Sequence, residues 1–208
     1  MESLLRITPP PSPHSSHPQT PSIHLIPTPV MTLFLIGYMA SGKSTLGRAL
    51  ARQLGYTFID LDFYIEQRYR KRIPEIFAEL GEEGFRDLEG RMLREAGEFC
   101  DTVISCGGGT PCFRDNMDYM LAAGTTIWLD STVGRICERI KVAKSRRPLL
   151  EGKRDDELRQ FVETHLAERL PYYRRARLRL PSDNLESREE IASTIRTLLR
   201  DLPNYGRD

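Results

Sequence analysis

The sequence of 208 residues predicts one α/β domain, a doubly wound and mostly parallel sheet of five strands flanked by helices. Three observations lead to this fold class. Short apolar runs that suit buried strands alternate with segments of helical apolar spacing. A complete glycine-rich motif, G-x-x-x-x-G-K-[ST], joins the first of these strands to the first helix. Further glycines and aspartates follow the later strands, at the edge of the sheet where such folds bind ligands.

The predicted elements follow one another in a regular order along the chain. Strands are expected at residues 33–36, 57–59, 102–105, 125–129 and, as the fifth, 177–180. The best-defined helix is Lys43–Leu54, because its apolar residues recur at helical spacing and Gly55 follows as a stop signal. Further helices are expected at about 63–72 and 84–99.

The first thirty residues differ from the rest of the chain. Residues 8–29 are rich in Pro, Ser, Thr and His, with almost no charge and no periodic apolar face. Such a composition cannot bury enough apolar surface to offset the entropy of ordering the chain. We therefore expect residues 1–30 to be a disordered leader and residues 31–208 to form the domain. The composition leaves open whether the leader is a misassigned start or a targeting segment.

Composition and charge argue against some classes of function. The formal net charge is +1, so no overall basic field points to nucleic acid. No apolar run approaches the ~20 residues of a membrane-spanning helix, so we expect no membrane partner. The four cysteines form no C-x-x-C pair and have no His-x-x-x-His partner. This favours reduced thiols in a cytoplasmic protein over a zinc site.

The glycine-rich motif spans residues 37–44 and carries the strongest functional signal. Its glycines let the backbone curve closely with its N–H groups towards phosphate oxygens, and the following helix presents its positive end to the same anion. Lys43 can then reach the β- and γ-phosphates, and the Ser44 hydroxyl can ligate Mg²⁺. A chance glycine-rich turn is the alternative, but the position between a strand and a helix favours a nucleoside triphosphate site.

Two aspartates follow the second predicted strand. Asp60 and Asp62 lie two residues apart, so on an extended strand end they are expected to point the same way. One can hold a metal ion through its water shell, and the other can face an acceptor hydroxyl and take or orient its proton. A bare Asp-x-Asp is more often a surface turn or a helix cap, but its place in a phosphate-loop domain favours a site.

Three further segments are candidates for the acceptor side. Arg86 and Glu89 are three residues apart on a predicted helix, where the acid can hold the guanidinium in one rotamer; alone, they would be an ordinary exposed pair. Three consecutive glycines, residues 107–109, follow a strand and indicate close approach of a ligand. The basic run 144–154 is either a solvated charge cluster or a mobile lid that brings an arginine to the transferred phosphoryl group.

Taken together, these motifs resemble those of the shikimate kinase family. They come in the family's order: the phosphate loop, Asp-x-Asp, Gly-x-x-x-Phe-Arg-x-x-Glu at 81–89, Gly-Gly-Gly, Arg-Pro-Leu-Leu at 147–150 and Arg-x-Pro-x-Tyr at 169–173. By itself Arg169 would be an ordinary residue on a helix surface, but the ordered set is highly specific. The resemblance covers about residues 31–199.

The resemblance implies transfer of the γ-phosphoryl group of ATP to the 3-hydroxyl of shikimate, a step of chorismate and aromatic amino-acid biosynthesis. It also implies the P-loop fold of nucleoside monophosphate kinases, with a mobile lid. One Mg²⁺ ion is the implied cofactor, with ATP as co-substrate. The partners are then small molecules, shikimate and ATP, bound by a monomer.

The resemblance further implies roles for individual residues. Asp62 binds the substrate hydroxyls and acts as the base or orienter, Lys43 and the lid residue Arg147 assist the transfer, and Ser44 and Asp60 serve the metal ion. The implied contacts of ATP are Ala40, Ser41, Gly42, Lys43, Ser44, Thr45 and Arg147. The implied contacts of shikimate are Asp62, Arg86, Gly107, Gly108, Gly109 and Arg169, with the two arginines on its carboxylate.

Some residues depart from the family's usual pattern. Ser105 and Cys106 precede the three glycines, where the family usually places a small threonine. Arg139 lies one residue from the position of an arginine that packs against adenine, and Ser187 stands near the place of a frequent proline. These changes concern the adenine contacts rather than the reaction.

Three alternatives fit the sequence less well than shikimate kinase does. A gluconate kinase would share the phosphate loop but should lack the combination of Asp62, Arg86, three glycines and Arg169. A nucleotide-binding regulator that has lost catalysis should lack Lys43, Asp62 or the lid arginine. A nucleic-acid kinase or binding module would need a basic stripe or stacking aromatic residues.

Overall fold

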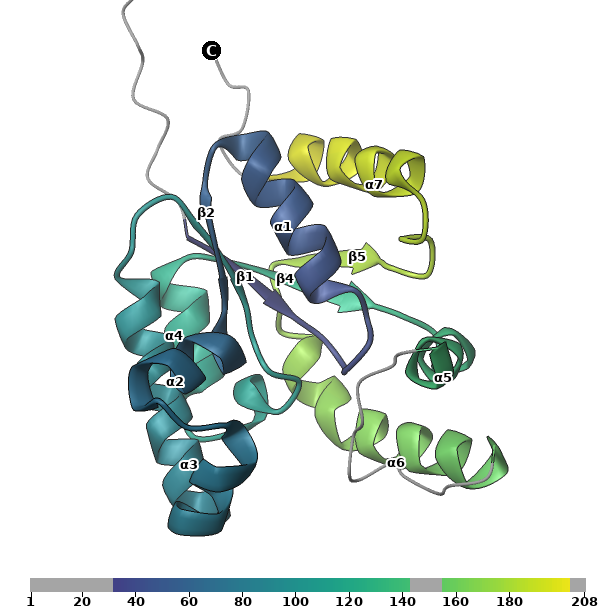
Figure 1. The fold of residues 1–208 in the computed structure, drawn as a ribbon. Coiled ribbons are helices and arrows are strands. Elements are labelled where there is room, and N and C mark those ends of the chain that lie inside the picture. Colours follow the sequence, from purple (N-terminus) through teal and green to yellow (C-terminus); the bar gives the residue numbers. More distant parts are fainter. Residues whose placement is uncertain (1–31, 143–154, 203–208) are drawn as a thin grey trace, which may run out of the picture.

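The computed structural model describes residues 32–142 and 155–202, which form one sheet covered by helices on both faces (Figure 1). Within these ranges the sheet has five strands in the order β2-β3-β1-β4-β5, and all neighbours are parallel. The strands are β1 (Thr32–Ile36), β2 (Thr57–Asp60), β3 (Thr102–Ser105), β4 (Thr125–Asp130) and β5 (Leu178–Pro181). The predicted parallel sheet is therefore confirmed, with β5 shifted by one residue.

Helices cover the sheet in two layers. They are α1 (Lys43–Leu54), α2 (Leu61–Tyr69), α3 (Ile73–Gly97), the 3-10 helix η1 (Thr110–Cys112), α4 (Asn116–Ala123), α5 (Val133–Val142), α6 (Asp155–Tyr173) and α7 (Arg188–Asp201). Figure 1 shows α1 and α7 on one face and α4 and α6 on the other. None of the helices in the described ranges is long and apolar enough to cross a membrane.

The central strand β1 shows how the sequence builds these two layers. Its four apolar residues are completely buried, and alternate side chains enter different cores. Leu33 and Leu35 pack with α1 and α7, while Phe34 and Ile36 pack with residues of α3, α4 and α6. Successive side chains of a strand point to opposite faces, so a strand covered on both sides must be apolar throughout. The continuous apolar run reflects this double cover.

The strand order also determines where a ligand can bind. β2 and β3 lie on one side of β1, and β4 and β5 lie on the other. The loops that leave the carboxyl ends of neighbouring strands therefore run in opposite directions beside β1. Open α/β sheets bind ligands in the crevice that such a switch point creates.

Two helix predictions need correction. α2 begins at Leu61, two residues earlier than expected, so Asp62 lies in its first turn and not on an extended strand end. The expected strand alternation of Asp60 and Asp62 is therefore wrong. α3 begins at Ile73 rather than near residue 84, and it is broken at Gly81, whose φ of 68° and ψ of −178° are not helical. Glycine adopts this backbone conformation without a side-chain clash, which is why the periodicity is interrupted there.

Two predicted segments lie outside the described residues. They are the leader, residues 1–30, and the basic run 144–154 with Arg147. The prediction of a disordered leader and of a lid therefore stays a prediction.

Candidate active site

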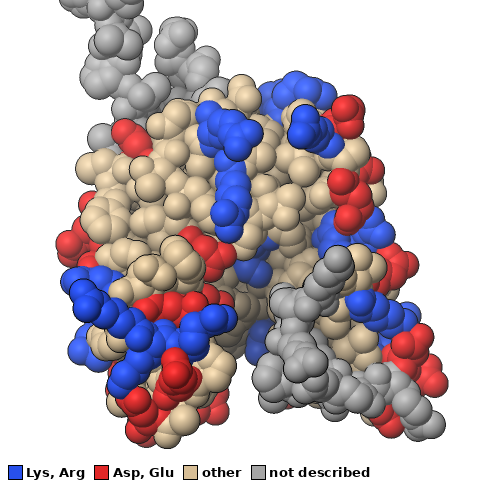
Figure 2. All heavy atoms as spheres, viewed as in Figure 1, with Lys and Arg blue, Asp and Glu red and all other residues tan. Residues whose placement is uncertain are grey.

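A cavity of about 880 Å³ opens at the carboxyl ends of the strands. Figure 2 shows the hollow beside the lobe formed by α2 and α3, with basic side chains inside it. Most of the predicted site residues line this cavity: Ala40, Gly42, Lys43, Ser44, Thr45, Asp60, Asp62, Arg86, Gly107, Gly108, Gly109 and Arg169. Ser41 is buried at 1% exposure and does not line it. Arg147 lies outside the described residues.

The phosphate loop wraps around the start of α1. Gly42 is the N-cap of α1 in a left-handed conformation (φ 96°), and as a glycine it has no side chain that could cap the helix. The N–H groups of the first turn of a helix have no intrahelical partner, so they are available to an anion. Gly37 has φ 141°, and a Cβ there would lie 2.6 Å from the Leu129 carbonyl oxygen. Both glycines are therefore required by the backbone of the loop.

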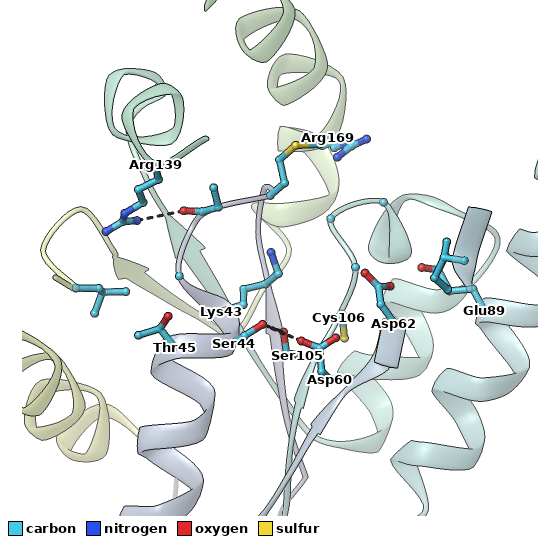
Figure 3. Close-up of a pocket in the computed structure, with 18 of the residues that line it drawn as sticks. Lys43, Ser44, Thr45, Asp60, Asp62, Glu89, Ser105, Cys106, Arg139 and Arg169 are labelled. Carbon is cyan, nitrogen blue, oxygen red and sulfur yellow. Dashed lines mark hydrogen bonds between the residues drawn. The ribbon is translucent and has the colours of Figure 1, made fainter. Parts of the chain in front are cut away.

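Lys43 points back over the loop that precedes it. Its Nζ donates hydrogen bonds to the carbonyl oxygens of Gly37 and Tyr38, both at 2.8 Å. Only 9% of the residue is exposed. A buried ammonium needs such partners, and they hold the positive charge at the floor of the cavity (Figure 3).

Ser44 and Asp60 form a hydrogen-bonded pair beside the phosphate loop. The Ser44 hydroxyl donates to Oδ2 of Asp60 at 2.8 Å, and its oxygen lies 3.5 Å from Oγ of Ser105 (Figure 3). Asp60 is the last residue of β2, so the end of the strand brings its carboxylate to the first turn of α1. Among the described residues, no group of three or more His, Cys, Asp and Glu side chains could hold a metal ion.

Asp62 lies further into the acceptor side, between the loop of α1 and the helix α3 (Figure 3). Although solvent reaches the residue through the open cavity, the surrounding protein displaces water from the carboxyl group. This desolvation, followed by the charges of Asp60 and Glu89, raises the pKa of Asp62 to about 6, against the opposing effect of Lys43. A carboxylate with such a pKa can accept a proton near neutral pH.

Arg86 enters the cavity from α3 and is held by a buried acid. Its Nη1 lies 3.2 Å from Oε2 of Glu89, whose side chain is only 2% exposed. Nη2 also lies 3.5 Å from the exposed Glu82. The pair that would be ordinary on a helix surface is thus buried at the edge of the site. A buried carboxylate paired with a guanidinium fixes the orientation of both groups.

The three glycines pass between the two arginines of the cavity. A Cβ on Gly108 would lie 3.1 Å from Nη1 of Arg169, and a Cβ on Gly109 would lie 3.2 Å from Nη1 of Arg86. The guanidinium of Arg169 also lies over the ring of Tyr38, 5.2 Å from its centroid. The glycines therefore let the backbone approach both guanidinium groups, a contact that the sequence pattern alone did not identify.

Sequence reasoning also missed a contact of the glycine loop with α6. The hydroxyl of Tyr173 donates to the Gly108 carbonyl oxygen at 2.6 Å, and the tyrosine is completely buried. Tyr173 is the last residue of the Arg-x-Pro-x-Tyr motif, so the motif contained this signal without revealing its partner. One end of α6 therefore supplies both Arg169 and the residue that fixes the neighbouring loop.

Arg139 closes the other end of the cavity. Its guanidinium donates to the carbonyl oxygens of Ser182 and Asp183, both at 2.9 Å, and to the hydroxyl of Ser131 at 3.1 Å. It also contacts the Ala40 carbonyl oxygen at 3.4 Å. These bonds join α5, the loop after β5 and the phosphate loop.

Comparison with known proteins agrees with this geometry. The sequence model of the shikimate kinase family matches residues 39–200. A shikimate kinase of Bacteroides fragilis is 51% identical over 169 residues, which cover 81% of this chain and 94% of that protein. The crystal structure of a shikimate kinase from Bacteroides thetaiotaomicron is 47% identical, with a TM-score of 0.80 over 82% of this chain and 97% of that one.

A third relative was solved with a ligand. The shikimate kinase from Acinetobacter baumannii in complex with shikimate is 29% identical, with a TM-score of 0.72 over 83% of this chain and 93% of that one. The family model spans most of the described domain, and the identity to the first relative is far above the level at which only a fold is shared. The chain therefore belongs to the shikimate kinase family.

Proposed function

We propose that this site transfers the γ-phosphoryl group of ATP to the 3-hydroxyl of shikimate and gives shikimate 3-phosphate and ADP. The observation that carries the proposal is the position of Asp62. Its carboxylate has a pKa of about 6 and lies in one cavity with the phosphate loop and with the arginine pair Arg86 and Arg169. A substrate with a reacting hydroxyl and a distant carboxylate matches this arrangement.

On the phosphate side, we assign residues 40–45 to the ATP phosphates. The backbone N–H groups of the loop and of the start of α1 are available to an anion, and Lys43 adds a positive charge at the floor of the cavity. Ser44 and Asp60 present oxygen atoms, which are the donors that Mg²⁺ prefers. The described residues lack a complete protein cage for a cation, so phosphate oxygens of ATP would complete its shell. The bound ion would neutralise charge on those phosphates.

On the acceptor side, Asp62 is proposed to orient the 3-hydroxyl and to accept its proton. Its raised pKa keeps it basic enough for that proton near neutral pH, while a substantial fraction stays ionised. Arg86 and Arg169 are proposed to bind the substrate carboxylate, because a guanidinium offers two parallel donors to the two oxygens. The backbone of Gly107, Gly108 and Gly109 then lies against the ring of the substrate.

Several parts of the proposal rest on sequence reasoning. Arg147 is proposed to reach the transferred phosphoryl group from a lid, and it lies outside the described residues. Four further points also stay predictions: the monomeric state, the absence of nucleic acid and membrane partners, the cytoplasmic location and the disordered leader.

A coupled ADP-release assay tests the acceptor. The protein is incubated with MgATP alone, with shikimate, with gluconate and with nucleoside monophosphates. We expect turnover that depends on shikimate and is lost when EDTA removes Mg²⁺. Turnover with another acceptor would retain the phosphate loop assignment and overturn the roles of Asp62, Arg86 and Arg169. ATP binding without turnover of any acceptor would favour the alternative that the protein is a nucleotide-binding regulator without catalytic activity.

A further inference from the structure

We propose that Thr110 and Phe113 are positioning residues for Arg86 and thereby set the affinity of the site for the carboxylate of the substrate. The two residues stand at either end of the short turn of η1, directly after the three glycines. Neither lines the cavity, so they act on the substrate through residues that do, and both lead to Arg86: Phe113 by direct contact and Thr110 through Glu89. The inference rests on the proposed function, in which Arg86 binds that carboxylate.

Thr110 acts through the buried acid Glu89. Its hydroxyl donates to Oε1 of Glu89 at 2.6 Å, while Oε2 of the same carboxylate accepts from Nη1 of Arg86 at 3.2 Å. Thr110 is completely buried and Glu89 is 2% exposed, so water does not compete for these bonds. Because each oxygen has its own donor, the plane of the carboxylate is fixed. The carboxylate in turn fixes the guanidinium.

The backbone around Thr110 is itself held in place. Its N–H donates to the Gly107 carbonyl oxygen at 3.1 Å, and its carbonyl oxygen accepts from Nδ2 of Asn116 at 3.0 Å. Nη1 of Arg94, on α3, donates to Oδ1 of the same asparagine at 3.1 Å. The turn is thus anchored to both α3 and α4. The Thr110 hydroxyl therefore offers Glu89 a donor in a defined position.

Phe113 contacts the guanidinium directly. The guanidinium carbon of Arg86 lies 4.0 Å from the centroid of this ring, closer than to the rings of Phe85 (5.5 Å) and Phe77 (5.9 Å). A cation at this distance from an aromatic face is attracted to it, and the attraction grows as water is removed. The ring therefore adds a second restraint to the Arg86 guanidinium, which Glu89 already holds by a hydrogen bond.

All of these contacts are made by the protein's own side chains, which gives them a functional meaning. A long arginine side chain loses conformational freedom when it binds a carboxylate, and this loss weakens binding. An arginine that is already held in one position loses less, and its affinity for the carboxylate is correspondingly higher. Removing either restraint should therefore weaken the binding of shikimate and leave MgATP binding nearly unchanged.

The first test compares Thr110→Val with Thr110→Ser. The valine removes the hydroxyl at nearly constant shape, and the serine retains it. We expect Thr110→Val to lower kcat/KM for shikimate by about five- to twentyfold, mainly through a higher KM. Thr110→Ser should recover most of the loss, and the KM for MgATP should change less than about twofold.

A matched control separates positioning from stability. Thr102 is as deeply buried as Thr110, and its hydroxyl donates to the Cys100 carbonyl oxygen at 2.8 Å at the far end of β3. Thr102→Val should lower the Tm without changing the KM for shikimate. An equal rise of that KM in Thr102→Val would overturn the proposal, because any loss of a buried hydroxyl would then suffice.

The second test removes the aromatic restraint. Phe113→Leu keeps an apolar side chain but removes the ring, whereas Phe113→Tyr retains the ring. We expect the leucine variant to raise the KM for shikimate by about threefold and the tyrosine variant to stay near the parent. This pair also carries the test if Thr110→Val does not fold.

A double-mutant cycle with Arg86→Ala separates the inference from the proposed function. If Arg86→Ala leaves kcat/KM for shikimate unchanged, the carboxylate assignment of Arg86 fails. If Arg86→Ala lowers it, Thr110→Val and Phe113→Leu should add almost nothing in the Arg86→Ala background, because their effect passes through the missing guanidinium. Full additivity, or parent-like kinetics of both variants with Arg86 present, would overturn the positioning role alone.

Discussion

The two sides of the cavity are built in different ways. The phosphate side comes mainly from one continuous segment, residues 37–45, most of which lines the cavity. The acceptor side is assembled from the start of α2, from α3, from the loop after β3 and from the end of α6. Several of its contacts join residues that are distant in sequence, such as Arg169 over Tyr38 and Thr110 at Glu89. A motif can therefore specify the phosphate side, whereas packing specifies the acceptor side.

The largest effect is expected from Asp62→Asn on the acceptor side. The amide keeps the size of the side chain but cannot accept the proton of the hydroxyl, so kcat should fall by about 10²- to 10⁴-fold. The affinity for MgATP, measured by calorimetry, should stay near the parent because the phosphate side is intact. Turnover near the parent level would remove Asp62 from the catalytic role.

A similar loss with a different signature is expected from Lys43→Met. Removing the charge at the floor of the phosphate loop should lower kcat by about 10²- to 10³-fold, as the loss of one preorganised donor does. Initial rates and calorimetry should show weaker MgATP binding and an unchanged affinity for shikimate. Equal losses on both substrates would show that the two sides are not independent.

The next effect is a loss of substrate affinity in Arg169→Ala. Its guanidinium lies beside Gly108 and over Tyr38, so the substrate carboxylate would lose one of two charged partners. Shikimate binding should weaken by about 2–5 kcal/mol. Arg169→Lys keeps the charge without the planar fork and should be intermediate. Unchanged shikimate affinity in the alanine variant would contradict the assignment.

A smaller effect is expected where the glycine loop meets Arg169. In Gly108→Ala the new Cβ would lie 3.1 Å from Nη1 of Arg169, so the guanidinium must move by a few tenths of an ångström. We expect the KM for shikimate to rise by about tenfold at most, because so small a shift costs about 1–1.4 kcal/mol, the lower end of the usual range for overpacking. Gly134→Ala in α5, where a Cβ would meet nothing within 4 Å, is the control and should leave this KM unchanged.

The smallest effect concerns stability and pH in the ligand-free protein with EDTA. Desolvation, Asp60, Glu89 and Glu66 raise the pKa of Asp62 from 3.8 to about 6, and Lys43 opposes them. A raised pKa means that the protonated form stabilises the fold, an effect fully present below about pH 4 and lost as the pH rises through about 6. The amide in Asp62→Asn cannot ionise. The Tm of this variant, relative to that of the parent, should therefore rise as the pH increases from 4 to 7.

The gain should be only a few degrees, because solvent in the open cavity screens the charges around the carboxylate. Thermal scans at both pH values measure it. A Tm difference that does not change with pH would contradict the raised pKa. If Asp62→Asn has a higher Tm than the parent at pH 7 and a much lower kcat, then the ionised Asp62 carboxylate lowers the stability of the fold while it supports catalysis.

The sequence by itself determined the class of fold and the phosphate side. The buried strands are continuous apolar runs because both faces of the sheet are covered, and such runs are visible without a structure. The phosphate loop could be identified because it is one uninterrupted segment of the sequence, residues 37–44. The order of the remaining motifs was enough to indicate the family, although it did not reveal how their side chains meet.

Only the tertiary structure decided how the acceptor side is arranged. Asp62 lies in the first turn of α2 and not at a strand end, as the sequence had suggested. Arg86 and Glu89, which helical spacing alone would leave exposed, form a largely buried pair. The tertiary structure also brought Thr110 and Phe113 to this pair. The physical reason is that burial and side-chain hydrogen bonds depend on which elements pack together, whereas sequence spacing records only neighbours within a single element.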